Sequence, residues 1–215
     1  ADSPRIGQIA RDVADGAIRF ISPENAGKIP HSRGEVVIDF SGDDGSRMAI
    51  ELALSRSAAI VIGTTALSTA TIAIADDAAK KIPLLISPNT SMGVAALASA
   101  VATVARLLGP SYECSIVEAH HSKKKDAPSG TALRLARAVK EAGAVMKDDQ
   151  IVAIRGGDVI GEHTVRFAGP GEYIELTHRA TSRDLFAMGA LRAARWLSGR
   201  AAGRYTTEDV LGIAA

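Results

Sequence analysis

The chain has 215 residues, of which 47% are hydrophobic, and its 25 basic and 24 acidic side chains leave a formal net charge of +1. The apolar content can fill a core, whereas the balanced charge argues against a nucleic-acid partner. The single cysteine, Cys114, excludes an intramolecular disulfide and fits a reducing compartment. The start shows no secretory signal, and the most apolar stretch is shorter than the ~20 residues that span a bilayer. We therefore expect a cytoplasmic chain with no membrane partner.

Short β-branched segments alternate with longer alanine-rich segments through the first half of the chain. Strands are predicted at VVIDFS (36–41), AAIVIGTT (58–65) and IPLLISPN (82–89), with helices between them. These strands are nearly continuous apolar runs, which is typical of parallel strands covered by helices on both faces. The alternation predicts a doubly wound parallel sheet, in which ligands bind beyond the carboxyl ends of the strands.

The pattern changes from about residue 90 onward. A long helical segment comes first, followed by the strand YECSIVEA (112–119), a polar loop and the helix PSGTALRLARAVKEAG (128–143). Three strands then follow without helices between them: QIVAIRG (150–156), IGEHTVRFAG (160–169) and EYIELTHRA (172–180). We expect an α+β domain with a mixed or antiparallel sheet here.

Two features complete this outline. Pro170-Gly171, between two alternating segments, predicts a hairpin, and the amphipathic segment 182–199 predicts a closing helix that packs back on the first domain. The expected division is a dinucleotide-binding domain of residues 1–89 and 190–215 and a substrate-binding and oligomerisation domain of residues 90–189.

The polar loop HHSKKKDAPSG (120–130) concentrates cationic and proton-transferring groups. Asp126 before Ala127-Pro128 predicts an N-cap, because proline fits the first helical turn. The next backbone N–H groups, at Ser129, Gly130 and Thr131, then form an anion site at the helix start. With the histidines and lysines just before it, the loop suits a small substrate that carries carboxylates and needs a proton.

Other interpretations of the same residues remain open. Runs of lysine are usually solvated, and at least two of Lys123–Lys125 are expected to be so. His120 and His121 are also candidate zinc ligands, together with His163 and His178. Neighbouring residues of an extended segment point to opposite sides, which argues against a shared metal.

The stretch EAHHSKKKDAPSGTA (118–132) resembles the signature of the dihydrodipicolinate reductase family, E-x-H-H-x-x-K-x-D-A-P-S-G-T-A. Three earlier segments are similar to the family in the same order: VIDFS (37–41), VIGTTALS (61–68) and ISPNTSMGV (86–94). Residues 157–199 follow the family almost continuously. The implied fold class is α/β, a Rossmann-like parallel sheet domain plus an α+β domain with a mixed or antiparallel sheet.

The resemblance also implies roles for individual residues. In the loop it implies that His120 and Lys124 are catalytic, with Lys124 as the proton donor, and that His121, Gly130 and Thr131 bind the substrate. In the first domain it implies binding of NADPH or NADH by two segments, the residues Gly63, Thr64 and Thr65 and the residues Ser87, Pro88, Asn89 and Thr90. Without the family, the GTT segment at a strand end is equally well explained as a turn.

The chain departs from the family at two places. The family opens with a strand and a G-x-x-G-x-M-G turn that holds the pyrophosphate, whereas here ADSPRIG (1–7) places Arg5, Ile6 and Gly7 at the last positions of that turn. We therefore expect the native chain to start before Ala1. The segment EAGAVMKDDQ (141–150) is shorter than the family loop at that place, which lies near the substrate site and the subunit contacts.

The resemblance implies an NAD(P)H-dependent reductase of 4-hydroxy-tetrahydrodipicolinate, in the diaminopimelate route to lysine, acting as a homotetramer on a small dicarboxylate. Two alternatives stay open. One is a paralogue with impaired cofactor binding that acts as a dicarboxylate-binding protein. The other is a related reductase of a different cyclic imine.

Overall fold

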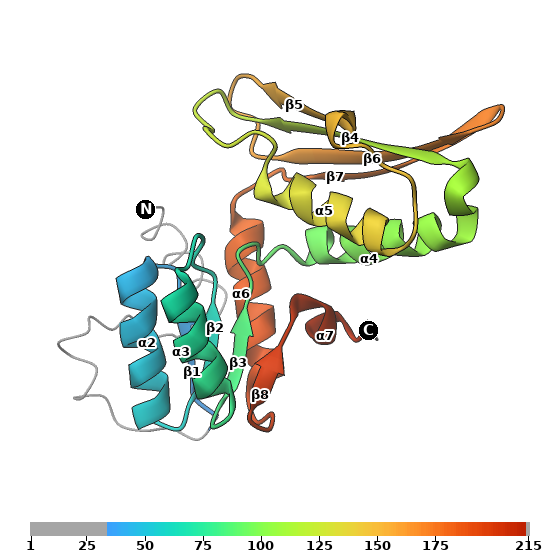
Figure 1. Ribbon diagram of the computed structural model, residues 1–215. Helices are drawn as coiled ribbons and strands as arrows, with labels where there is room; N and C mark the ends of the chain where they lie inside the picture. The colour runs from blue at the N-terminus through green and yellow to red at the C-terminus, as the bar shows by residue number, and fades with distance from the viewer. Residues whose placement is uncertain (1–33, 214–215) are drawn as a thin grey trace. The chain divides into compact units, whose positions relative to one another are not determined.

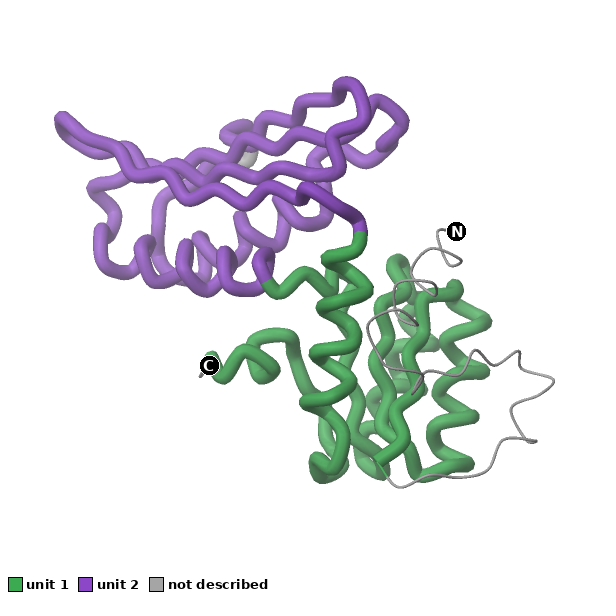
Figure 2. Tube along the Cα trace, turned by 180° about the vertical axis from the view of Figure 1, so that it is seen from behind, with its two compact units in different colours: residues 1–92, 184–215 green, residues 93–183 purple. Residues whose placement is uncertain are grey.

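A computed structural model describes residues 34–213, apart from the side chain of Asp148, and divides the chain into two compact units. The first unit extends to Met92 and resumes at Asp184, and the second unit runs from Gly93 to Arg183. Figure 2 shows the two units in different colours. Each unit has its own sheet and its own hydrophobic core.

The sheet of the first unit is parallel throughout, as predicted. Its strand order is β1-β2-β3-β8, with β1 at Val36–Asp39, β2 at Ala59–Ile62, β3 at Pro83–Ile86 and β8 at Gly203–Tyr205. Helices α2 (Asp43–Ser55) and α3 (Thr69–Ala79) cover one face, and α6 (Asp184–Leu197) covers the other (Figure 1). A Rossmann-like α/β unit is therefore confirmed.

Burial of β2 on both faces explains its continuous apolar sequence. Ile60 and Ile62 belong to the core formed with α2 and α3, whereas Ala59 and Val61 belong to the core formed with α6. A strand covered on both faces has no polar side, so its sequence does not alternate.

The end of the chain contains two elements that the sequence did not predict. The three-residue strand β8 extends the parallel sheet beside β3, and the short helix α7 (Thr207–Leu211) follows it. The hydroxyl of Thr206 accepts a hydrogen bond from the N–H of Asp209, which caps α7. Val210 of this helix is buried with β2, β3 and α6.

The carboxyl ends of β1, β2 and β3 lie at one edge of the sheet. The N–H of Gly63 donates to the carbonyl of Asp39 at 2.8 Å, and the N–H of Ser87 donates to the carbonyl of Ile62 at 2.8 Å. These bonds continue the parallel ladders past the strand ends, so the residues after each strand are aligned at this edge. Doubly wound sheets bind their ligands at such an edge.

Asp43, in the first turn of α2, joins that helix to α3. Its carboxylate accepts hydrogen bonds from the N–H of Ser68 at 2.7 Å and from the Ser68 hydroxyl at 3.0 Å, and it pairs with Arg47 at 2.6 Å. The hydrogen bond from the Ser68 N–H is the main cause that lowers the pKa of Asp43 to about 2, and Thr71, Ser68 and Arg47 lower it further.

We expect the Asp43 interactions to be lost in acid. Because the folded-state pKa is depressed, their contribution to stability is fully present above about pH 3.8 and disappears as the pH falls toward about 2. In Asp43→Asn, the free energy of unfolding is expected to depend less on pH in this window than it does in the wild type, because the contribution of Asp43 is gone. Urea unfolding at several pH values measures this, with Asp44→Asn, an exposed neighbour in the same turn, as the control.

The second unit has a mixed sheet, as predicted, with strand order β5-β4-β6-β7. The central strand β4 (Glu113–His120) is parallel to β5 (Ile151–Arg155) and antiparallel to β6 (Glu162–Gly169), which forms a hairpin with β7 (Glu172–Arg179). Gly171 has a φ of 82°, which glycine adopts readily, so the predicted hairpin is confirmed at Pro170-Gly171.

Helices α4 (Met92–Leu108) and α5 (Gly130–Glu141) pack on one face of this sheet (Figure 1). Along β4, Cys114, Ile116, Glu118 and His120 point toward this helix-covered face and are buried. The strand therefore begins with apolar core residues and ends with polar ones on the same face. The 3-10 turn η3 (Asp148–Gln150) connects α5 to β5.

The segment Met92–Ser111, which comprises α4 and the following turn η2 (Gly109–Ser111), is long and apolar enough to cross a bilayer, by length and composition only. This corrects the expectation that the segment is too short. Its residues Leu97, Ala98, Val101 and Ala105 are buried in the core of the second unit. The helix therefore serves as a core element of a folded unit.

Candidate active site

Gly63, Thr64 and Thr65 follow β2 at the carboxyl edge of the first sheet. Gly63 packs against Phe40, and a Cβ at this position would lie 2.2 Å from the Phe40 ring. The hydroxyl of the buried Thr64 donates to Asp39 at 2.7 Å, and Thr65 is exposed. Gly63 and Thr64 are thus held by the fold itself, whereas the side chain of Thr65 is exposed at this edge.

The buried carboxylate of Asp39 organises this edge. It accepts hydrogen bonds from the hydroxyls of Ser41 at 2.5 Å, Ser46 at 2.6 Å and Thr64 at 2.7 Å. These bonds connect the end of β1 to the start of α2 and to the turn after β2. Two residues after Thr64 in that turn, Ala66 has a φ of 57°, at the position where the family pattern has glycine.

The second segment predicted to bind the cofactor, Ser87 to Thr90, follows β3. The Ser87 hydroxyl donates to the Asn89 carbonyl at 2.7 Å, and the Thr90 hydroxyl donates to the Phe186 carbonyl at 2.7 Å. Both side chains are buried, whereas Pro88 is exposed and Asn89 is half-buried. Ser87 and Thr90 therefore shape the segment, and Pro88 and Asn89 form its accessible part. Arg5 and Ile6, predicted for the pyrophosphate turn, lie outside the described residues.

In the second unit, α5 begins at Gly130, and its N-cap is Ser129. The prediction of Asp126 as the N-cap is wrong. The Ser129 hydroxyl accepts from the N–H of Ala132 at 3.2 Å, which satisfies one donor of the first turn. Ser129 also donates its own N–H to Glu118 at 3.0 Å, so that N–H points into the protein. Gly130 and Thr131 stand in the first turn, where the helix dipole favours an anion.

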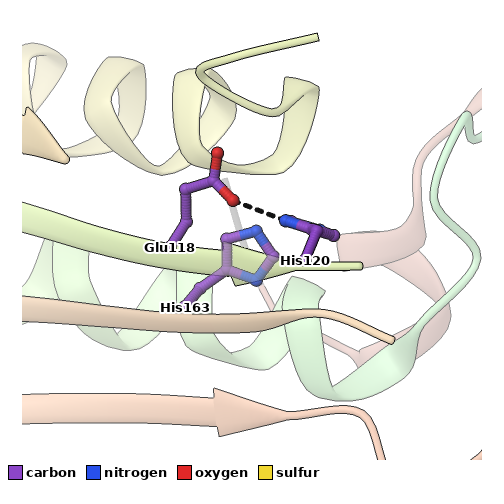
Figure 3. A group of neighbouring side chains, drawn as sticks. All are labelled: Glu118, His120 and His163. Carbon is purple, nitrogen blue, oxygen red and sulfur yellow. Dashed lines mark hydrogen bonds and ion pairs between the residues drawn. The ribbon is translucent and has the colours of Figure 1, made fainter. Parts of the chain in front are cut away.

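A group of buried polar side chains lies beneath this helix start (Figure 3). Glu118 and His120 come from β4, and His163 comes from the neighbouring strand β6. The Nδ1 of His120 lies 2.5 Å from Oε2 of Glu118, and the rings of His120 and His163 meet edge to face with 5.1 Å between their centroids. The Ser129 hydroxyl lies 3.1 Å from Nε2 of His163.

Arg155 completes this network from β5. Its Nη1 and Nη2 donate to the two oxygens of Glu118 at 2.9 and 2.8 Å, the bidentate arrangement that makes a strong ion pair. Nη2 also donates to the carbonyl of Asp126 at 2.6 Å. One guanidinium thus connects the end of the central strand to the loop before α5.

The environment lowers the pKa values of all three side chains, but for different reasons. Burial lowers the pKa of His163 to about 4, and repulsion from His120 adds to this effect. Burial also lowers the pKa of His120, against the hydrogen bond and charge of Glu118, which raise it. Burial alone raises the pKa of Glu118, but the hydrogen bonds from Arg155, His120 and Ser129 together lower it. Near neutral pH we therefore expect a neutral His163 beside an ionised Glu118.

The three consecutive lysines differ in their surroundings. Lys123 and Lys125 are exposed, in agreement with the prediction, whereas Lys124 is half-buried and its ammonium lies 2.7 Å from the carboxylate of Asp126. The positive charge of Lys124 contributes to the lowered pKa values of His120 and His163. Lys124 is therefore within electrostatic reach of both imidazoles. His121 follows β4 and is half-buried.

The zinc alternative involves part of the same group. Glu118, His120 and His163 offer ligand atoms within 4.8 Å of one another. However, both oxygens of Glu118 already accept two hydrogen bonds each, and the guanidinium of Arg155 occupies the place beside them. A cation would meet that positive charge at short range, so the contacts favour a hydrogen-bonded network over a metal centre. His178 lies opposite His163 on β7.

Sequence analysis assigned no role to Glu118 or Arg155 and considered His163 only as a metal ligand. It expected the N–H of Ser129 at the anion site, whereas this N–H binds Glu118. Glu118 has a detectable signal, because a glutamate at an inward position of a buried strand requires a charged partner. The partner itself, Arg155, is distant in sequence and has no local signal. Strand pairing brings it opposite His120.

The parallel sheet with an aligned carboxyl edge and the buried acid–base group at a helix start define an α/β enzyme of the Rossmann-like class. Two protein-family models then identify the family to which this enzyme belongs. The dihydrodipicolinate reductase N-terminus matches residues 7–90, and the C-terminus of the same family matches residues 93–211. The chain belongs to the dihydrodipicolinate reductase family and is an oxidoreductase, which confirms the predicted family and class of enzyme.

Curated relatives agree with this assignment. The chain is 42% identical over 226 residues to a 4-hydroxy-tetrahydrodipicolinate reductase of Myxococcus xanthus, covering 97% of this chain and 80% of the relative. It is 45% identical over 202 residues to the reductase of the same name from Stenotrophomonas maltophilia, covering 94% of this chain and 82% of that protein.

A solved structure supports the fold alone. Dipicolinate-bound dihydrodipicolinate reductase from Paenisporosarcina sp. TG-14 superposes with a TM-score of 0.71 at 19% sequence identity, covering 92% of this chain and 84% of that one. Family membership implies a nicotinamide cofactor in general and a small-molecule substrate.

Proposed function

We propose that the chain reduces 4-hydroxy-tetrahydrodipicolinate to tetrahydrodipicolinate in the diaminopimelate route to lysine, with NADPH or NADH as the reductant. The single observation that carries the assignment of roles is the placement of His120 and Lys124. Both stand beside the start of α5, within electrostatic reach of each other.

The reaction balances as the loss of water from the substrate, the addition of a hydride and the addition of a proton. A nicotinamide nucleotide bound to the first unit would supply the hydride with its electron pair, which accounts for its oxidation to NADP⁺ or NAD⁺. The chain supplies the proton, and we assign its delivery to the ammonium of Lys124, with His120 as the partner in proton transfer. General acid catalysis of this kind accelerates reactions by about 100- to 10,000-fold.

Substrate carboxylates are assigned to the first turn of α5 and to His121. The N–H groups of Gly130 and Thr131 lie at the positive end of the helix dipole, which stabilises an anion. In the structure Lys124 is paired with Asp126, whose pKa the lysine lowers. Substrate carboxylates therefore have to compete with Asp126 for the same ammonium.

The first unit fits a nicotinamide nucleotide at the carboxyl edge of its sheet. Asp39 and Phe40 fix the backbone of Gly63 and Thr64, and the exposed Thr65 follows them. On the adjacent strand, Pro88 and Asn89 form the accessible part of the segment after β3. We assign contacts with the nicotinamide end of the nucleotide to these two segments.

A homotetramer is proposed on the basis of the second sheet. The face of this sheet opposite α4 and α5 exposes apolar side chains on three strands, at Val117, Val152, Ile154 and Tyr173. Exposed apolar patches on a sheet are typical of subunit contacts.

The free, buried Cys114 is consistent with the reducing conditions of the cytoplasm, which we propose as the location of the protein.

The proposed activity predicts the outcome of a direct assay. Purified protein, with substrate generated enzymatically in the same cuvette, is expected to oxidise NADPH or NADH only when the substrate is present. Running the two nucleotides separately determines the cofactor preference. If neither nucleotide is consumed although both bind, the reduction of this substrate is refuted. Absence of nucleotide binding would point instead to a dicarboxylate-binding protein.

A further inference from the structure

Glu118 is a completely buried carboxylate at the end of β4, with 0% of its surface exposed. Nothing in the proposed proton transfer uses it. Its oxygens accept four hydrogen bonds, from Nδ1 of His120, from the N–H of Ser129 and two from the guanidinium of Arg155. A buried carboxylate is costly unless it is paired and hydrogen-bonded, and here both conditions are met.

The contacts of Glu118 determine the tautomer of His120. An ionised carboxylate only accepts hydrogen bonds, so the Nδ1 of His120 has to carry the proton in the bond of 2.5 Å to Oε2. In the neutral ring, the other nitrogen, Nε2, then has a free lone pair and can accept a proton. Gly161 leaves room beside it, since a Cβ there would lie 3.1 Å from Nε2.

The same carboxylate also connects His120 to the start of α5. It binds the N–H of Ser129, the N-cap of that helix, at 3.0 Å. Arg155, bound to both Glu118 oxygens, donates in addition to the carbonyl of Asp126, whose carboxylate holds Lys124. The proposed base, the proposed acid and the anion-binding turn are therefore fixed to one another through a single ion pair.

We propose that Glu118, paired with Arg155, is a positioning residue that holds His120 in the tautomer with Nε2 available for proton transfer. This inference rests on the proposed function for its kinetic consequence but not for its structural one. We assign Glu118 no contact with substrate or cofactor. It acts through His120.

The kinetic test uses two substitutions with opposite expected effects. Glu118→Gln removes the negative charge beside His120, so the pH limb of kcat that reports His120 is expected to move to lower pH, and kcat is expected to fall about 100-fold. Arg155→Met removes a positive charge, so the same limb is expected to move to higher pH. The KM for the nucleotide is expected to stay unchanged in both variants.

The other groups that face His120 and Glu118 remain in place in both variants. They are Lys124 and Asp126 in the loop and His163 on β6, and His163 in turn is paired with His178 on β7. Glu113→Gln, an exposed carboxylate-to-amide change at the start of the same strand, is the matched control and is expected to leave kcat and its pH profile unchanged. General damage to the fold does not displace the limb in opposite directions.

A spectroscopic measurement separates this inference from the proposed function. In ¹⁵N NMR spectra of the substrate-free protein, His120 is expected to show a protonated Nδ1 and an unprotonated Nε2, and Glu118→Gln is expected to reduce this preference. A wild-type protein that shows this tautomer of His120 but has no activity would refute the proposed reaction without refuting the positioning role of Glu118. An unchanged tautomer in Glu118→Gln, or pH limbs that fail to move in opposite directions, would overturn the role of Glu118. If Glu118→Gln does not fold, Arg155→Met alone tests the direction of the shift.

Discussion

Replacing Lys124 by alanine is expected to lower kcat by about 100- to 10,000-fold, the contribution that a general acid typically makes. The half-buried ammonium of Lys124 lies beside the start of α5 and acts electrostatically on His120, so its removal takes the proposed proton donor from the site. Binding of NADPH is expected to be nearly unaffected, because the proposed nucleotide segments belong to the first unit. Steady-state kinetics and a fluorescence titration with NADPH measure the two quantities.

Lys123→Ala is the matched control for this experiment. Lys123 precedes Lys124 in the same loop and carries the same charge, but it is exposed to solvent. The control variant is expected to keep the kcat of the wild type. Equal kcat values for the wild type and Lys124→Ala would remove Lys124 from the proposed mechanism.

Replacing Gly189 by alanine is expected to destabilise the first unit by about 3 kcal/mol, at the upper end of what overpacking typically costs. A Cβ at Gly189 would lie 1.8 Å from the carbonyl oxygen of Thr90, and backbone cannot rotate away as a side-chain end can. One turn earlier in α6, the carbonyl of Phe186 accepts a hydrogen bond from the Thr90 hydroxyl, which holds the two segments together. Relief of the clash therefore has to displace the segment after β3.

Urea unfolding of the variant measures this loss of stability. Met188→Ala is the control, because Met188 is the neighbouring residue of the same helix and is exposed. This variant is expected to change the free energy of unfolding by less than about 1 kcal/mol. A Gly189→Ala variant as stable as the control would show that α6 and the segment after β3 separate at little cost. Because that segment includes Pro88 and Asn89, weaker nucleotide binding is expected to accompany the destabilisation.

Much of the fold is predictable from local sequence. The apolar runs of β1, β2 and β3 and the alanine-rich segments between them predict a parallel sheet covered by helices, because strands buried on both faces lose their alternation. Pro170-Gly171 predicts its hairpin through turn chemistry. The strand β8 escaped prediction because three residues carry no periodicity, and its pairing with β3 depends on the return of the chain through α6.

The start of α5 shows how a local rule fails. Asp126 followed by Ala127-Pro128 satisfies the usual signals of an N-cap. Ser129, three residues later in the same loop, is also a residue type that commonly caps helices. Ser129 takes the role because its N–H and hydroxyl both find buried partners, Glu118 and His163. Those partners lie on β4 and β6, so the choice between the two caps is made by packing.

The sequence by itself determined the two-part α/β architecture, the family and the loop with its histidines and Lys124. These depend on periodicity and on a contiguous motif, which are local properties. Only the tertiary structure decided that Glu118 and Arg155 form an ion pair under that loop. The registers of β4 with β5 and β6 place Arg155 opposite His120 and His163 opposite Glu118, and strand register is a property of segments far apart in the chain.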